Sequence, residues 1–509
     1  TIRILPEGIR KLSLVMIAAM SIVIWLQSNI IIWEYGVLDG RDIDWTKANW
    51  RGFVDSSIWF ICLFASIIYY RKIGRGIINL ALALFILQFV SISYLCVENY
   101  SSINNKKENE DKDLVKLSSF SSKQNILHIL VDGFQSDVFL DLISDEQLGS
   151  DYRKSFSGFK YYEETLGVFP FTRFSVPAIL SGKLYRNQMP KDEFLDTTLS
   201  EKTIISVAYE NGYEVDMAIG NPYFARKYAN AKFTNFYEIN SEDRISETVK
   251  LLDLSLFRSS PHFVKPYIYN NQEWLLKSLM LGESPIGDYV AHTVFLNRLI
   301  SEMHIARDKP VYKYMHVMNT HNPMVTNEDC VYAGGKIPTN RTSLTNQSKC
   351  TLDTLVRFFD QMKKLRIYDD ALIMVHADHG GHVANHREGL PILFANGSTA
   401  IFQVASLASP LLMFKLPNAS SDFKISKIQA SLADIPDTIS GIMNWNTDFG
   451  HSSLLTIDPN VDRERRFRFY AWQRDAWESD YTGRIQEFII KGSHYEEKWE
   501  LGPVYDPPE

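Results

Sequence analysis

The sequence predicts an N-terminal group of transmembrane α-helices, followed by an α/β domain whose largely parallel central sheet lies between helices. Two patterns support this prediction. Uncharged apolar stretches fill much of the first part of the 509-residue chain, and short apolar strands then alternate with amphipathic helices. Alternation of strands and helices is typical of a parallel sheet that is covered on both faces.

Three apolar stretches are interpreted as membrane spans, at about residues 12–33, 54–70 and 77–97. The first and the last are long enough to cross a hydrocarbon core of about 30 Å, and the middle one is short. A buried core helix is the alternative for any one of them. Because charged loops separate the three, we expect residues 1–97 to form a transmembrane domain.

Basic residues predict the orientation of these spans. Arg3, Arg10 and Lys11 precede the first span, and residues 71–75 between the second and the third are also basic. The positive-inside rule makes both regions cytoplasmic, although basic residues in the intervening loop weaken the bias. With three spans, the chain after residue 97 is expected to lie outside the cytoplasm.

The cysteines agree with that topology. Cys62 and Cys96 fall within predicted spans, which leaves Cys330 and Cys350 in the rest of the chain. Two cysteines that close a loop of about twenty residues are expected to form a disulfide in an oxidising compartment, two free thiols being the alternative. The net charge of −7 and the lack of a basic run argue against nucleic acid as a partner.

Polar residues stand at the carboxyl ends of three of the predicted strands, at 125–134, 311–320 and 371–380. They are Asp132, His321 and the pair Asp378 and His379. A single Asp or His at a strand end is usually structural, but ligands of such sheets sit outside the carboxyl ends of the strands. Carboxylates with imidazole suit zinc or manganese.

Two hydroxyls compete as a nucleophile in "FPFTRFSVPAILSG", residues 169–182. Thr172 and Ser175 stand three residues apart, and such residues are most often turn or cap residues. A free hydroxyl is a poor nucleophile, but a metal ion lowers its pKa. The residues alone leave the choice between the two open.

Several segments together resemble the alkaline phosphatase and sulfatase superfamily, and within it the membrane-anchored phosphoethanolamine and phosphoglycerol transferases, such as lipid A phosphoethanolamine transferases and lipoteichoic acid synthases. In chain order they are "ILVDGF", "FTRFSVPAILSG", "NTHNPM", "HADHGGH" and "SPLLMFKLPN" with "LADIPDTISGIM". The resemblance implies an alkaline-phosphatase-like catalytic domain at 125–455, after a polar linker at 98–124 and before a β-rich extension at 456–509. It also implies a bacterial inner membrane, with the catalytic domain on the periplasmic side.

The resemblance selects Thr172 as the nucleophile. In this superfamily the nucleophile stands about ten residues before the Gly that closes its helix, here Gly182, and the transferases share the pattern Thr-x-x-Ser-x-Pro. Ser175 with Pro177 superficially matches the sulfatase pattern Cys/Ser-x-Pro-x-Arg. Because Ile179 stands where the Arg belongs, a sulfate ester hydrolase is disfavoured.

The resemblance also implies a metal site. One zinc or manganese ion is expected on Asp132, Thr172, Asp378 and His379. Two-metal relatives supply a further Asp and His from mid-domain, but residues 309–326 contain only His316 and His321 as candidates. A second ion remains an option, and the histidines near it in sequence, for that ion or for the substrate, are His376, His382 and His386.

The implied reaction is ping-pong. Thr172 attacks the phosphorus of a phospholipid donor, diacylglycerol leaves, and a glycan or glycolipid hydroxyl takes the head group from a phospho-threonine. His321 is expected to bind the phosphoryl oxygens, with His382 as a further substrate contact, and His386 to protonate the leaving oxygen. The alternatives are a hydrolase of phosphate or sulfate esters and a non-catalytic, lipid-binding membrane regulator.

Overall fold

The computed structural model describes residues 6–35, 43, 45–98, 115–219, 232–234, 244–270, 274–281, 291–385, 390–393, 398–472, 479–495 and 499–508. The chain divides into two compact units. The helical unit comprises Thr1–Asn109 and Ser241–Pro285, and the α/β unit comprises Glu110–Asn240 and Ile286–Glu509. The sequence predicted one uninterrupted domain over 125–455, but Ser241–Pro285 belongs to the helical unit.

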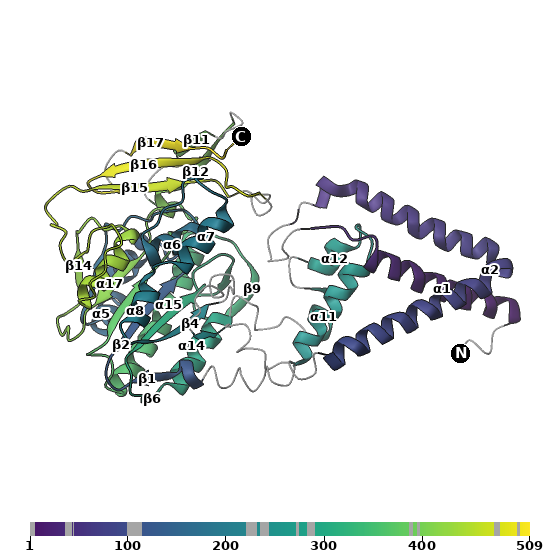
Figure 1. Cartoon of the computed structure of the whole chain (residues 1–509), viewed down its shortest axis with the longest axis horizontal. Helices are drawn as coiled ribbons and strands as arrows, with labels where there is room; N and C mark the ends of the chain where they lie inside the picture. The colour runs from purple at the N-terminus through teal and green to yellow at the C-terminus, as the bar shows by residue number, and fades with distance from the viewer. Residues whose placement is uncertain are drawn as a thin grey trace. The chain divides into compact units, whose positions relative to one another are not determined.

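Two helices of the helical unit are long and apolar enough to cross a membrane, α1 (Glu7–Asn29) and α2 (Asn49–Glu98). The second and third predicted spans both fall within α2. A straight helix of its 50 residues would be about 75 Å long, far more than a bilayer core requires. Figure 1 shows α2 as two arms that meet at a sharp bend, so each arm has the length of one crossing.

The excursion from the α/β unit contributes α11 (Arg244–Ser259), α12 (Lys265–Tyr269) and α13 (Leu275–Leu281) to the helical unit. These helices share a small buried core with the chain between α1 and α2, which also contains the 3-10 helix η2 (Trp45–Ala48). The core consists of Ile43, Phe257, Ile268, Tyr269 and Trp274. Ile43 and Phe257 of this core lie more than 200 positions apart in the sequence, so no local sequence pattern predicts the core.

The α/β unit is built on an eight-stranded sheet. In spatial order the strands are β14 (Lys424–Ser426), β3 (Phe159–Tyr162), β13 (Leu412–Lys415), β10 (Leu372–His376), β2 (Asn125–Val131), β7 (Val311–Val317), β4 (Glu214–Ile219) and β5 (Lys232–Thr234). Only β13 runs antiparallel to its neighbours, β10 and β3. The predicted strands at 125–134, 311–320 and 371–380 are thereby confirmed, as is the fold class.

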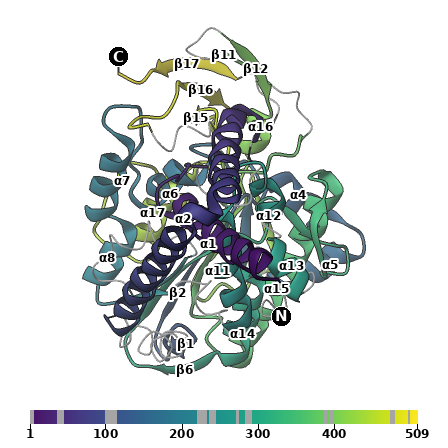
Figure 2. The same ribbon diagram turned by 90° about the vertical axis from the view of Figure 1, so that its right-hand side faces the viewer.

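Alternate residues of the central strands enter two different cores. Ile126 and Leu130 of β2 belong to one core, and Leu127, Ile129 and Val131 belong to the other. Figure 2 shows the two helix layers on either side of β2. One layer has α6 (Thr172–Ser181), α7 (Lys191–Ser200), α8 (Ile204–Glu210) and α17 (Ile435–Ile442), and the other has α4 (Ser136–Ser144), α5 (Leu148–Ser155), α14 (Ala291–Glu302) and α15 (Arg341–Lys364).

Smaller sheets complete the α/β unit. The antiparallel sheet of β15 (Glu464–Phe469), β16 (Ile485–Lys491) and β17 (Glu500–Tyr505) forms the β-rich C-terminal part, and both views place it beside β11 (Leu390–Leu393) and β12 (Thr399–Phe402). The other elements are the pairs β1 (Ser119–Ser121) with β6 (His304–Arg307) and β8 (Met324–Thr326) with β9 (Tyr332–Ile337), the helix α16 (Val404–Leu407) and the 3-10 helix η4 (Leu432–Asp434). Strand β1 lies within the stretch predicted as a linker.

Candidate metal centre and active site

Two neighbouring strands, β2 and β10, bring three of the predicted metal ligands together. Strands β10 and β7 both pair in parallel with β2, so their carboxyl ends meet at one edge of the sheet. Asp132 follows β2, and Asp378 and His379 follow β10. One ligand atom from each of the three lies within 4.8 Å of the others, and all three side chains are buried.

The atoms of this cluster suit a divalent cation. Oδ1 of Asp132 and Oδ2 of Asp378 are buried, and neither accepts a hydrogen bond from any described residue. A buried carboxylate oxygen that accepts no hydrogen bond raises the free energy of the folded protein unless a positive charge compensates it. Such oxygens, together with imidazole, fit zinc or manganese.

His379 is oriented as a metal-ligating histidine would be. Its Nδ1 lies 2.7 Å from the carbonyl oxygen of Gly380, to which it can only donate. Its Nε2 then faces Oδ1 of Asp132 at 3.5 Å and Oδ2 of Asp378 at 3.6 Å. A backbone carbonyl that holds the second ring nitrogen is a common support for a metal ligand.

The charges in the cluster are mutually stabilising. Burial by itself would lower the pKa of His379, but the carboxylates of Asp378 and Asp132 outweigh it, and the pKa is raised. Burial would raise the pKa of Asp132, but His321, the hydrogen bond from His316 and the charge of His379 lower it instead. The site therefore favours an ionised Asp132 with positive charge beside it.

Thr172 is the hydroxyl that reaches this centre. It is the first residue of α6, and its Oγ1 donates to Oδ2 of Asp132 at 3.2 Å. The residue before it, Phe171, has no side-chain oxygen with which to cap the helix. The N-terminus is the positive end of a helix dipole, which favours the negative charge of phosphoryl oxygens.

Ser175 has a different position. Its side chain is fully buried, and its Oγ donates to the carbonyl oxygen of Phe169 at 3.0 Å. This bond ties the first turn of α6 to the segment that enters it. Ser175 therefore helps to hold the first turn of α6, which begins at Thr172.

Two glycines allow close backbone approaches around the centre. Gly182 ends α6 in the left-handed region, at φ +70°, and a Cβ there would lie 2.6 Å from the carbonyl oxygen of Phe449. Gly380 follows His379 directly, and a Cβ there would lie 1.8 Å from the carbonyl oxygen of Ser406. Side chains at these positions would displace the nucleophile helix or the ligand loop.

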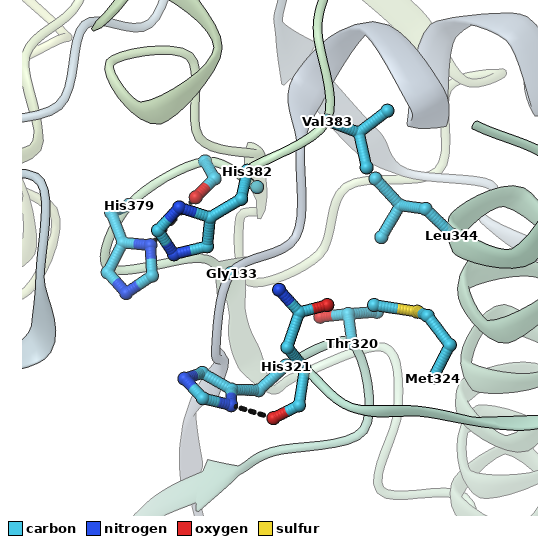
Figure 3. A pocket seen from close by; sticks show the side chains of 11 residues that line it. Gly133, Thr320, His321, Met324, Leu344, His379, His382 and Val383 are labelled. Carbon is cyan, nitrogen blue, oxygen red and sulfur yellow. Dashed lines mark hydrogen bonds between the residues drawn. The ribbon is translucent and has the colours of Figure 1, made fainter. Parts of the chain in front are cut away.

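A pocket opens beside the centre, with one polar and one apolar wall (Figure 3). The polar side includes His321, Asn322, His379 and His382, and the apolar side includes Met324, Leu344 and Val383. The ring of His382 stacks on Phe171, with centroids 6.0 Å apart. His321 and His382 thus lie where a substrate would contact them, whereas the predicted His386 falls outside the described residues.

Comparison with known proteins agrees with this geometry. Residues 124–444 match the model of the sulfatase family. The chain belongs to the sulfatase family. The superfamily resemblance is thereby confirmed. No curated protein matched the sequence.

Solved structures similar to this sulfatase-family chain include enzymes of several kinds. The lipoteichoic acid synthase LtaP from Listeria monocytogenes is 11% identical, with a TM-score of 0.43, over 76% of this chain and 92% of that one. The lipooligosaccharide phosphoethanolamine transferase EptA from Neisseria meningitidis is 12% identical, with a TM-score of 0.38, over 88% and 87%. The phosphonate monoester hydrolase from Silicibacter pomeroyi is 10% identical, with a TM-score of 0.42, over 75% and 89%.

Three further histidines of the sulfatase-family domain are His316, His292 and His376. The sequence offered His376 for a second ion or for the substrate, but the structure pairs it with His128 inside the sheet, and the sequence named His316 only as a candidate for a second metal. His316 donates from Nε2 to Oδ2 of Asp132 at 3.0 Å. His292, on α14, is buried near the same group, and burial together with the charge of His316 lowers its pKa to about 3. His376 instead pairs with His128, with 2.7 Å between their Nε2 atoms, inside the sheet. A single His in a helix or strand carries no sequence signal for such long-range contacts.

Proposed function

We propose that the protein is a membrane-bound, metal-dependent transferase. It moves a phospholipid head group, phosphoethanolamine or phosphoglycerol, through a phospho-threonine on Thr172 to a cell-envelope glycan or lipid. The observation that carries the proposal is the 3.2 Å contact between Oγ1 of Thr172 and Oδ2 of Asp132. It sets a hydroxyl at the edge of a buried cluster suited to a cation, at the start of a helix.

Asp132, Asp378 and His379 would hold a zinc or manganese ion together with the Thr172 oxygen. Such an ion supplies the positive charge that lowers the pKa of a hydroxyl and offsets charge on a phosphoryl group. A second ion near His321 and His382 is compatible with the donor atoms there. The residues of the chain supply the remaining steps.

Thr172 Oγ1 forms a bond to phosphorus while the bond from phosphorus to the diacylglycerol oxygen breaks. The hydroxyl proton leaves toward Oδ2 of Asp132, to which it is already hydrogen-bonded. We propose that the leaving oxygen takes a proton from His386, with His321 on the phosphoryl oxygens. An acceptor hydroxyl then attacks the phospho-threonine and restores the free threonine.

The helical unit supports a lipid donor. Helices α1 and α2 have the length and composition of membrane spans, and they would hold the active site near a phospholipid. Cys330 and Cys350 are joined by a disulfide in the α/β unit. Structural disulfides belong to oxidising compartments, which supports a periplasmic position of this unit on the bacterial inner membrane.

The position of Ser175 supports a threonine nucleophile over a sulfatase-type residue. A formylglycine at 175 would need access to substrate, but this side chain is fully buried. Ile179, where the sulfatase pattern has Arg, is also fully buried among apolar residues. Both observations speak against sulfate ester hydrolysis.

The test uses the full-length protein in phospholipid vesicles that contain a head-group-labelled donor. With a membrane glycolipid fraction as acceptor, we expect labelled acceptor and free diacylglycerol in equal amounts. Without acceptor, we expect label on the peptide of residues 169–182. Release of free head-group phosphate at the same rate with and without acceptor would show a hydrolase instead. No turnover and no bound metal would show a non-catalytic lipid-binding regulator.

A further inference from the structure

The excursion Ser241–Pro285 is anchored to the membrane-spanning helices rather than to the domain from which it comes. Nε of Arg258, in the last turn of α11, donates to the carbonyl oxygen of Ser28 near the end of α1 at 2.7 Å. The ring of Phe263 covers Gly52 in the first turn of α2, where an added Cβ would lie 2.5 Å from the ring. The excursion is therefore attached at the same end of both spans.

A buried carboxylate secures this attachment. Asp55 of α2 is fully buried and accepts from Nε1 of Trp33 and from the backbone N–H of His262, both at 2.8 Å. Nδ1 of His262 also lies 2.8 Å from the hydroxyl of Tyr35. A buried carboxylate that lost these donors would be costly, so the arrangement holds the excursion in one position.

Aromatic side chains mark the level of the membrane at this end. Trp33 and Trp50 make an edge contact at 5.1 Å, and Tyr35 lies beside Trp45 at 5.6 Å. The guanidinium of Arg51 lies over Trp33, Tyr35 and Trp50. Clusters of Trp and Tyr with a basic residue are typical of the boundary between lipid and water.

The docked helices expose large apolar side chains at that boundary. Tyr267 is 76% exposed, Leu279 72%, Leu251 63% and Met280 61%. Phe53, in the first turns of α2, is 67% exposed, so the apolar surface continues from the span onto the excursion. Residues 244–281 also carry five basic and three acidic residues, although the whole chain is acidic.

We propose that α11, α12 and α13 form a membrane-interface module, whose exposed apolar side chains enter the head-group and upper acyl region of the bilayer. The apolar side chains supply the burial, and the excess of basic residues favours anionic lipids. The inference rests on the membrane placement that the proposed function gives to α1 and α2.

The test measures the depth of single labels in the full-length protein in phospholipid nanodiscs. Cys62→Ala and Cys96→Ala provide the background, and Tyr267→Cys and Leu279→Cys each receive a fluorophore. Lipids spin-labelled near the head group or near the chain end, and aqueous iodide, serve as quenchers. Both side chains are largely exposed, so the substitutions leave the packing intact.

Two further labels separate the possible results. Phe85→Cys, on the 68% exposed Phe85 of α2, reports the span, and Lys424→Cys, at an exposed position of the α/β unit, reports water. We expect the labels at 267 and 279 to be quenched by head-group spin labels and poorly by iodide. Iodide quenching there, with lipid quenching at 85, would overturn the interface module alone. Protection from both quenchers would indicate a protein partner and would overturn it too. Iodide quenching at 85 would overturn the membrane placement itself.

Discussion

Thr172 and His316 share one oxygen of Asp132. Oγ1 of Thr172 donates to Oδ2 at 3.2 Å and Nε2 of His316 donates to the same atom at 3.0 Å. The other oxygen, Oδ1, accepts no hydrogen bond from the described residues and faces His379. One carboxylate thus positions the nucleophile with one oxygen and offers the other to a cation.

The first prediction separates the two hydroxyls of α6. Thr172→Ala should abolish head-group transfer while metal and lipid still bind, because no other described hydroxyl donates to the carboxylate of Asp132. Ser175→Ala is the matched control. It leaves the carbonyl of Phe169 without its buried donor, at a cost of about 1–3 kcal/mol in stability, and should reduce transfer only about tenfold.

Mass spectrometry decides this prediction. Fragments of the peptide 169–182, trapped without acceptor, should carry the added phosphate group on Thr172. Phosphate on Ser175, or full activity of Thr172→Ala, would contradict the assignment.

The second prediction concerns the metal. Asp378→Asn should lose bound zinc or manganese while the fold persists, since an amide cannot supply the charge that a cation needs. Asp434→Asn is a suitable control, because Asp434 is equally buried but pairs with Arg463 far from the site in sequence. It should lower the midpoint of thermal unfolding and leave the metal content, measured by mass spectrometry of the ions, unchanged. Equal metal content in both variants would show that the ligands lie elsewhere.

His316 should act as a positioning residue. His316→Ala removes the hydrogen bond that orients Asp132, and the loss of such outer partners typically lowers metal affinity by about 10–100-fold. Titration with a metal buffer measures the change directly. The ring of His376 pairs with His128 inside the sheet. The variant His376→Gln should therefore leave metal affinity near that of the wild type. A larger loss of metal affinity in His376→Gln than in His316→Ala would rule out the positioning role of His316.

Acid should weaken the attachment of the C-terminal sheet. Burial alone would raise the pKa of Glu164, but hydrogen bonds from His494 and Ser493 outweigh it and lower this pKa to about 2. A carboxyl whose pKa is lower in the folded state than its ordinary 4.5 contributes stability above that value and loses it as the pH falls toward 2. The difference in unfolding free energy between the wild type and Glu164→Gln should therefore be larger at about pH 6 than at about pH 3. If the difference in unfolding free energy did not change with pH, the pairing of an ionised Glu164 with His494 would be refuted.

The disulfide should support the pocket. Cys350 lies on α15, one turn after Gln347, which accepts from the N–H of Val325 at 2.8 Å and donates to the carbonyl of His321 at 3.3 Å. Cys330→Ser with Cys350→Ser opens a loop of 20 residues and should lower the unfolding free energy by about 3 kcal/mol. Peptide mapping without reductant should find the two cysteines linked in protein from its native membrane. Free thiols there would remove this support for a periplasmic domain.

Much of the fold follows from local patterns. The apolar runs before Asp132 and Asp378 have the length and composition of buried strands, and the structure has strands there, β2 and β10. The polar residues that end these strands were predicted to meet because parallel strands end at one edge, and they do meet. Strand period, strand direction and the residue that stops a strand are all encoded by near neighbours in the chain.

The tertiary structure decided which partner each side chain finds. It directed His316 to Asp132 and His376 to His128, although both stand near the ends of strands that pair in parallel with β2. It also joined Ser241–Pro285 to the apolar helices of the N-terminal part through Asp55, which no periodicity of either segment indicates. Contacts of this kind depend on which surfaces remain to be buried once all elements are assembled, and on which donors then face a buried charge. These are properties of the whole folded chain, so no window of its sequence contains them.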